Sequence, residues 1–97
     1  MVRGQYQPRR YRQLVTMWFL YLLECNNGAY YAGITNDVEA RYAAHVEGQG
    51  AKYTKANPPL RLLGTRAYAD RSSASRAEWE IKQLPKAKKL AYLKGPS

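Results

Sequence analysis

A chain of 97 residues has room for one small hydrophobic core, so we expect one domain of five or six elements. Sixteen lysines and arginines against seven acidic residues give a net charge of +9, which predicts a polyanionic partner, nucleic acid first. The single cysteine excludes an internal disulfide and a thiolate metal cage. No stretch approaches the roughly 18 apolar residues of a membrane span and no secretory leader is visible, so we expect a cytoplasmic protein.

Residues 1–16 carry four arginines and no acidic residue, and Gly4 and Pro8 interrupt any periodicity. We expect a flexible basic tail, which would either contact phosphates or be a solvated extension. The single domain is expected over residues 17–97.

Two strand-like runs separated by turn residues predict a β-hairpin. Met17–Glu24 is apolar or aromatic almost throughout, which is typical of a central strand covered on both faces. Residues 26–28 read Asn-Asn-Gly and tolerate positive φ angles, and strand character resumes over Ala29–Thr35.

The length of the hairpin loop determines which side chains share a face of the sheet. A two-residue loop would place Tyr21 and Tyr31 on opposite faces. A three-residue loop with Gly28 in the left-handed conformation places both on one face and pairs Tyr21 with Gly33. We predict the second register, in which the missing side chain of Gly33 leaves room for a ligand beside a tyrosine ring.

A helix is predicted over Val38–Val46, with Asp37 as its N-cap. Its inward stripe consists of Val38, Tyr42, His45 and Val46. Arg41 borders this stripe one turn before His45. Residues 48–59 are predicted to be a loop, which carries three candidate substrate-binding side chains: Lys52, Tyr53 and Lys55.

A third strand is predicted over Leu60–Tyr68, followed by a turn and cap at residues 70–73. The apolar stripe of a second helix consists of Ala74, Ala77, Ile81 and Leu84. Pro85 ends that helix, and a basic third helix follows over Lys86–Leu93. Glu78 and Glu80 flank the stripe about equally, so helical periodicity does not choose between them.

The element order with its polar residues resembles the GIY-YIG nuclease superfamily. The motif residues are Tyr21 on the first strand, Tyr31-Ala32-Gly33 on the second, Arg41 on the first helix and Glu78 on the second. The segments YLLEC, YYAGITNDVEARYAAH, GAKYTK and SRAEWEIK are similar to the small stand-alone single-domain bacterial members. The resemblance covers about residues 17–93. It departs from the family pattern in the first motif, which reads Tyr21-Leu22-Leu23 preceded by Leu20 and lacks the namesake glycine and isoleucine.

The resemblance implies an α+β fold with a three-stranded, mostly antiparallel sheet flanked by about three helices. It implies a site that cleaves a phosphodiester with a divalent metal ion. The catalytic residues carried over are Tyr21, Tyr31, Arg41 and Glu78, with Gly33 shaping the floor. His45 and Lys52 match positions typical of the small members.

These residue types suit phosphodiester hydrolysis. A single carboxylate, Glu78, is enough to hold one Mg²⁺ or Mn²⁺ ion that otherwise keeps water and phosphate oxygens as ligands. Arg41 would place a fixed charge on the phosphate oxygens. One of the two tyrosines, Tyr21 or Tyr31, would deprotonate the attacking water, with His45 as its proton relay.

Each candidate also has a purely structural interpretation. In this interpretation Tyr21 and Tyr31 are core aromatics and His45 is a packing residue. Arg41 is a surface cation. Glu78 would then form an exposed pair with Lys82, worth only ~0.3–0.5 kcal/mol. Trp79 is expected in the core or against the third helix, with base stacking as the lesser alternative.

The leading hypothesis is a metal-dependent endonuclease, monomeric or weakly dimeric, with DNA as the substrate before RNA. Single-stranded or branched DNA is the candidate form. The alternative is a non-catalytic nucleic-acid-binding module that keeps the fold and the basic surface.

Overall fold

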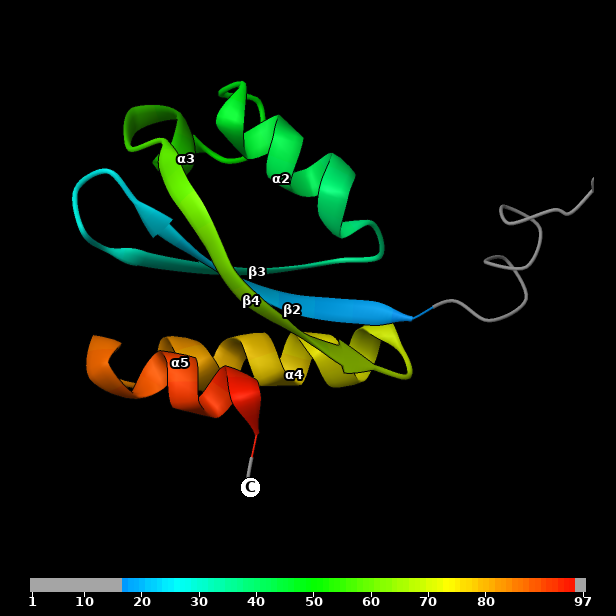
Figure 1. Ribbon diagram of the computed structural model, residues 1–97. Helices are drawn as coiled ribbons and strands as arrows, with labels where there is room; N and C mark the ends of the chain where they lie inside the picture. Colours follow the sequence, from blue (N-terminus) through cyan, green and yellow to red (C-terminus); the bar gives the residue numbers. More distant parts are fainter. Residues whose placement is uncertain (1–16, 96–97) are drawn as a thin grey trace, which may run out of the picture.

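The computed structural model describes residues 17–95 and shows an antiparallel sheet with helices on both faces (Figure 1). The strands are β2 (Trp18–Cys25), β3 (Tyr30–Thr35) and β4 (Pro59–Tyr68). The helices are α2 (Val38–Val46), α3 (Lys52–Ala56), α4 (Arg71–Lys82) and α5 (Lys86–Lys94). The predicted α+β fold and three-stranded sheet are confirmed. The predicted tail, residues 1–16, lies outside the described residues.

Strand β2 is central, because the strand order in the sheet is β3-β2-β4. Side chains alternate between the faces of a strand, and Leu20, Leu22 and Leu23 are all 0% exposed. Helices α2 and α3 cover one face of the sheet, and α4 and α5 cover the other (Figure 1). The prediction of a central strand that is buried on both faces is therefore confirmed.

The hairpin between β2 and β3 has the predicted register. The backbone N–H of Cys25 donates to the carbonyl oxygen of Ala29 at 2.8 Å, which leaves a loop of residues 26–28. Gly28 adopts φ +87°, a conformation that L side chains rarely adopt. Tyr21 consequently lies opposite Gly33.

Aspartates begin the helices α2 and α4, as predicted. The Asp37 carboxylate accepts from the backbone N–H of Ala40 at 3.2 Å at the start of α2. The Asp70 carboxylate accepts from the backbone N–H of Ser73 at 2.8 Å at the start of α4. Each bond satisfies one of the N–H groups that a helix leaves unpaired in its first turn.

Two local predictions are wrong. The predicted loop 48–59 contains α3, a helix of only five residues. Val46, predicted on the inward stripe of α2, is 51% exposed, whereas His45 is 0% exposed. Neighbouring residues of a helix point roughly 100° apart, so with His45 against the sheet, Val46 at the end of α2 faces outward.

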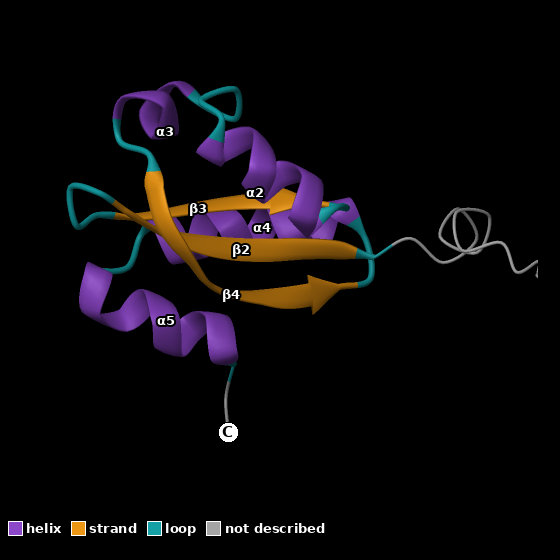
Figure 2. Cartoon of the chain, turned by 45° about the horizontal axis from the view of Figure 1, so that its top comes forward, coloured by secondary structure: helices purple, strands orange, loops and turns teal. Residues whose placement is uncertain are grey.

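The main apolar core lies between the sheet and the helices α4 and α5 (Figure 2). Its buried members are Leu20, Leu22, Ala32, Ala77, Ile81 and Leu93. Trp79 is not part of this core, since it is 65% exposed, and its expected core position is wrong. Within residues 17–95, no helix is long and apolar enough to span a membrane.

Candidate active site

The hydroxyl of Tyr21 is the centre of a polar network on the α2 face of the sheet. Tyr21 is 3% exposed, and its hydroxyl lies 2.8 Å from Nε2 of His45. The Nε–H of Arg41 points at the same hydroxyl from 3.4 Å. The three side chains come from β2 and α2, which the hairpin and the Asp37 cap bring together.

Gly33 makes room for the Tyr21 ring. A Cβ atom at Gly33 would lie 2.5 Å from Cζ of Tyr21 and closer still to its hydroxyl oxygen. The space that the sequence suggested for a ligand is therefore filled by Tyr21 itself. Gly33 shapes the site by letting the phenol cross over β3.

Besides Tyr21, the His45 ring contacts Tyr31, Gly50 and Thr54. Its ring packs against the Tyr31 ring with a centroid distance of 5.4 Å and an interplanar angle of 64°. A Cβ atom at Gly50 would lie 2.7 Å from Cγ of His45, so Gly50 permits the ring to pack against the loop backbone. The Nδ1 atom lies 2.6 Å from Oγ1 of Thr54, a residue that the sequence analysis did not single out.

The side chains of α3 border this network. The Tyr53 ring stacks on the Tyr31 ring at a centroid distance of 6.0 Å, and its hydroxyl accepts from Nδ2 of Asn27 at 2.8 Å. Lys52 and Lys55 are exposed and line a pocket of about 310 Å³ with residues 48–51. Of the three predicted substrate-binding side chains, Tyr53 thus contacts the network through Tyr31, whereas Lys52 and Lys55 line the pocket formed with residues 48–51.

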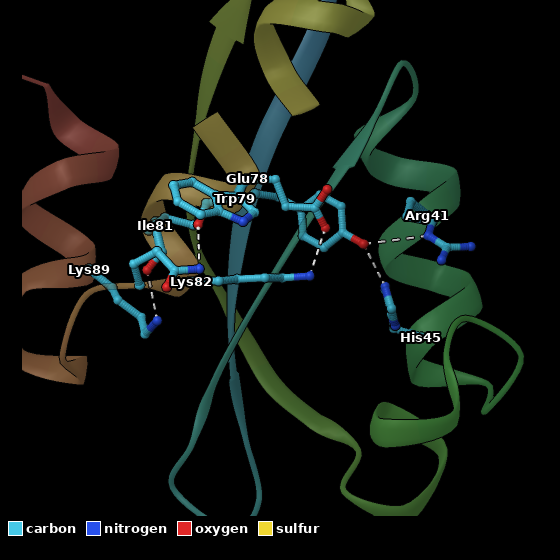
Figure 3. A network of polar contacts seen from close by, with 9 residues as sticks. Arg41, His45, Glu78, Trp79, Ile81, Lys82 and Lys89 are labelled. Atoms are coloured by element: carbon cyan, nitrogen blue, oxygen red, sulfur yellow. Dashed lines mark hydrogen bonds and ion pairs between the residues drawn. The ribbon is translucent and has the colours of Figure 1, made fainter. Parts of the chain in front are cut away.

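Glu78 approaches from α4, on the other face of the sheet. Figure 3 shows it extending from α4 toward the side where Arg41 and His45 lie. Its carboxylate forms an ion pair with Lys82 at 2.9 Å, and its side chain is 26% exposed. Glu80 points elsewhere, since its carboxylate accepts from the hydroxyl of Tyr92 at 2.6 Å. The structure therefore separates the two glutamates that helical periodicity did not distinguish.

The electrostatics of the network favour neutral side chains at its centre. Burial raises the pKa of Tyr21; Arg41 opposes this, and the charges of Tyr31 and Glu78 add to it. Burial, with a smaller contribution from Arg41, lowers the pKa of His45. At neutral pH the network therefore contains a protonated phenol beside a neutral imidazole.

The metal ion implied by the resemblance has a minimal donor set here. The part of the chain that the structure describes has no group of three or more His, Cys, Asp or Glu side chains able to hold a metal. Mg²⁺ binds oxygen and is often held by one or two carboxylates, with water and phosphate oxygens completing its shell. The Glu78 carboxylate, partly exposed and facing the network, fits that requirement.

The sequence and the fold of this chain are similar to those of known proteins. Residues 17–91 match the family model described as the GIY-YIG catalytic domain. A UPF0213 protein of Xanthomonas campestris pv. campestris (strain 8004) is 63% identical over 76 residues, which cover 78% of this chain and 74% of the relative.

Two solved structures are also similar. The solution NMR structure of the UPF0213 protein BH0048 from Bacillus halodurans is 40% identical with a TM-score of 0.50, and the match covers 82% of this chain and 88% of that one. The solution NMR structure of the protein EF2693 from E. faecalis is 37% identical with a TM-score of 0.56, over 80% and 83% of the two chains. With most of its length matched by the family model, this chain belongs to the GIY-YIG catalytic domain family.

Proposed function

We propose that this protein is a metal-dependent endonuclease that hydrolyses phosphodiester bonds in DNA. Membership of the GIY-YIG catalytic domain family suggests a nuclease. The single observation that carries the finer proposal is the Tyr21 hydroxyl, placed between the His45 imidazole and the Arg41 guanidinium.

The Tyr21 hydroxyl and His45 form a path for one proton. A tyrosine with a raised pKa is a poor base alone, because it keeps its proton at neutral pH. His45 can accept the hydroxyl proton of Tyr21. As the Tyr21 oxygen takes a proton from the attacking water, the hydroxyl proton passes to Nε2 of His45, 2.8 Å away. The lowered pKa of His45 keeps the ring neutral and able to accept. Tyr21 is therefore the proposed base, and Tyr31 helps to orient the water.

Arg41 supplies fixed positive charge beside the base. Its Nη2 donates to the carbonyl oxygen of Gly50 at 3.0 Å, which fixes the guanidinium while Nε points at Tyr21. A half-buried guanidinium held this way stabilises negative charge on a phosphate without having to reorganise during the reaction.

Glu78 is the proposed ligand for Mg²⁺ or Mn²⁺. When bound, such an ion acts as a Lewis acid and stabilises the leaving oxygen. The Glu78 carboxylate pairs with Lys82 at 2.9 Å, and the Lys82 ammonium lies close enough to this carboxylate to contact a phosphate bound there.

An exposed aromatic residue favours a substrate with unpaired bases. Trp79 follows Glu78 directly on α4 and is 65% exposed, so its ring face is available for stacking (Figure 3). Stacking and the net charge of +9 carry little base-specific information, which favours single-stranded or branched DNA without a strict recognition sequence.

The decisive experiment is cleavage of labelled oligonucleotides with and without Mg²⁺. The panel contains single-stranded, duplex and branched DNA, with RNA as a further arm. We expect Glu78→Gln to lower cleavage by about 10²-fold or more, on the scale of losing one electrostatic stabiliser of the transition state. Glu80→Gln is the matched control, because Glu80 lies on the same helix but bonds Tyr92, and it should cut like the unaltered protein.

The same experiment tests the alternative from a different class. A nucleic-acid-binding module would bind the panel with and without metal and cut none of it. Cleavage confined to the RNA arm would replace DNA by RNA as the substrate. Equal cleavage by the Glu78→Gln and Glu80→Gln proteins would remove Glu78 from the site.

A further inference from the structure

Thr54 contacts His45, the residue that accepts the proton in the proposed path. It lies on α3, which the sequence predicted as loop, and it is 0% exposed. Its Oγ1 lies 2.6 Å from Nδ1 of His45 and 3.2 Å from the carbonyl oxygen of Ala51. A buried hydroxyl between an imidazole and a carbonyl has a defined direction of hydrogen bonding.

The number of protons on Thr54 and His45 determines the direction of these hydrogen bonds. A carbonyl oxygen only accepts, so the single hydroxyl proton of Thr54 goes to Ala51. Oγ1 is then an acceptor for the Nδ1–H of His45 at 2.6 Å. In a neutral ring Nε2 is left with a lone pair, and it accepts the hydroxyl proton of Tyr21 at 2.8 Å.

The opposite direction leaves one buried proton unsatisfied. If Thr54 donated to Nδ1, then Nε2–H would donate to the Tyr21 oxygen, which already receives the Nε–H of Arg41 at 3.4 Å. The proton of Tyr21 would then lack a hydrogen-bond acceptor within residues 17–95. Leaving a buried donor without an acceptor is unfavourable, so the first direction is favoured.

We propose that Thr54 is a positioning residue that holds neutral His45 as its Nδ1–H tautomer, with Nε2 open to the Tyr21 proton. Free histidine prefers the other tautomer, so the protein must select this one. The structural part of the proposal stands on the contacts above, and its catalytic consequence rests on the proposed nuclease function.

The tautomer is directly measurable, because His45 is the only histidine in the chain. A long-range ¹H–¹⁵N NMR spectrum of the folded protein near pH 7.5 should show one imidazole with Nδ1 protonated and Nε2 unprotonated. Thr54→Val removes the acceptor at nearly constant shape and should shift the ring toward the Nε2–H form. Thr54→Ser keeps the hydroxyl and should preserve the original pattern.

A wild-type spectrum of the Nε2–H form would overturn the proposal without any variant. So would a folded Thr54→Val protein whose ring pattern is unchanged.

Kinetics test the catalytic part separately. In the Ser-His-Asp triad, losing the group that sets the histidine tautomer costs about 10⁴ in kcat. A neutral hydroxyl is a weaker partner than a carboxylate, so we expect Thr54→Val to lower kcat by about 10- to 10²-fold, within the range of general-base effects, with KM for the oligonucleotide unchanged. Thr54→Ser should restore most of the rate.

The two measurements keep the two proposals apart. A changed tautomer with unchanged kcat would show that Thr54 does not act in catalysis. A wild-type protein that cuts nothing would refute the proposed function, while the NMR spectrum would still decide the role of Thr54.

Discussion

Two residues without side chains determine how the central pair of rings packs. Gly33 lies under the Tyr21 phenol, and Gly50 lies against the His45 imidazole. A Cβ atom at either position would come within 3 Å of ring atoms, so the rings could not keep their present positions. The hydrogen bond of 2.8 Å between the Tyr21 hydroxyl and Nε2 of His45 therefore depends on the close approach of backbone to both rings.

The two tyrosines differ in their connection to His45, and this predicts different mutant phenotypes. The Tyr21 hydroxyl bonds Nε2, whereas the Tyr31 ring only packs its edge against the imidazole. We expect Tyr21→Phe to lower kcat by about 10²- to 10⁴-fold, the usual contribution of general base catalysis. Tyr31→Phe should cost less, because the proton path stays intact. Single-turnover cleavage of one oligonucleotide by both variants makes the comparison.

Circular dichroism and thermal melting of both variants serve as the folding control. Tyr21→Phe also leaves the Nε2 acceptor unsatisfied, so a modest loss of stability is expected for it alone. Faster cleavage by Tyr21→Phe than by Tyr31→Phe would reverse the assignment and make Tyr31 the base.

At the scale of elements, the sequence predicted the features that interactions between residues close in the chain determine. The register of the hairpin was predicted from the pairing of Tyr21 with Gly33, and the structure has this register, with Gly28 at φ +87°. Helix α3 was missed because it has only five residues. Gly48 and Gly50 precede it and two prolines follow it, a pattern that is typical of a loop. It is stabilised by contacts such as Tyr53 on Tyr31 that appear only in the fold.

The exposed face of α4 next to Glu78 predicts a binding phenotype. Trp79 is 65% exposed, so Trp79→Ala should leave the melting temperature nearly unchanged. It should weaken binding of single-stranded DNA by ~1–3 kcal/mol, the range measured for one base stacked on an aromatic ring. Fluorescence anisotropy with a chelator present measures this binding without cleavage.

Ser75→Ala is the matched control on the same helix, since Ser75 is exposed and has no ring. It should bind like the unaltered protein, and duplex DNA should distinguish the two variants less than single strands do. Equal affinity of Trp79→Ala and Ser75→Ala for single strands would argue against base stacking on α4.

At the scale of the whole molecule, the site draws on both faces of the sheet. Tyr21, Arg41 and His45 meet on the α2 face of the sheet, whereas Glu78 extends toward them from α4, which covers the other face (Figure 3). The motif residues were predictable because their order along the chain is typical of the family. The role of Thr54 was not, because a single hydroxyl has no periodicity or spacing and acquires its meaning only from two tertiary contacts.

The buried imidazole at this junction makes folding stability depend on pH. Because the pKa of His45 is lowered below its ordinary value of 6.5, the unfolded chain binds a proton more readily than the folded protein does. The stabilisation from neutral His45 is fully present above pH 6.5, and it declines on acidification until the pH reaches the lowered folded-state pKa. The lowered pKa of Asp70, set by its bonds to Ser73, acts only nearer its ordinary value of 3.8. Urea denaturation between pH 8 and pH 5 should therefore show a falling midpoint in the unaltered protein and a nearly flat one in His45→Gln, whereas parallel curves would place the titrating group elsewhere.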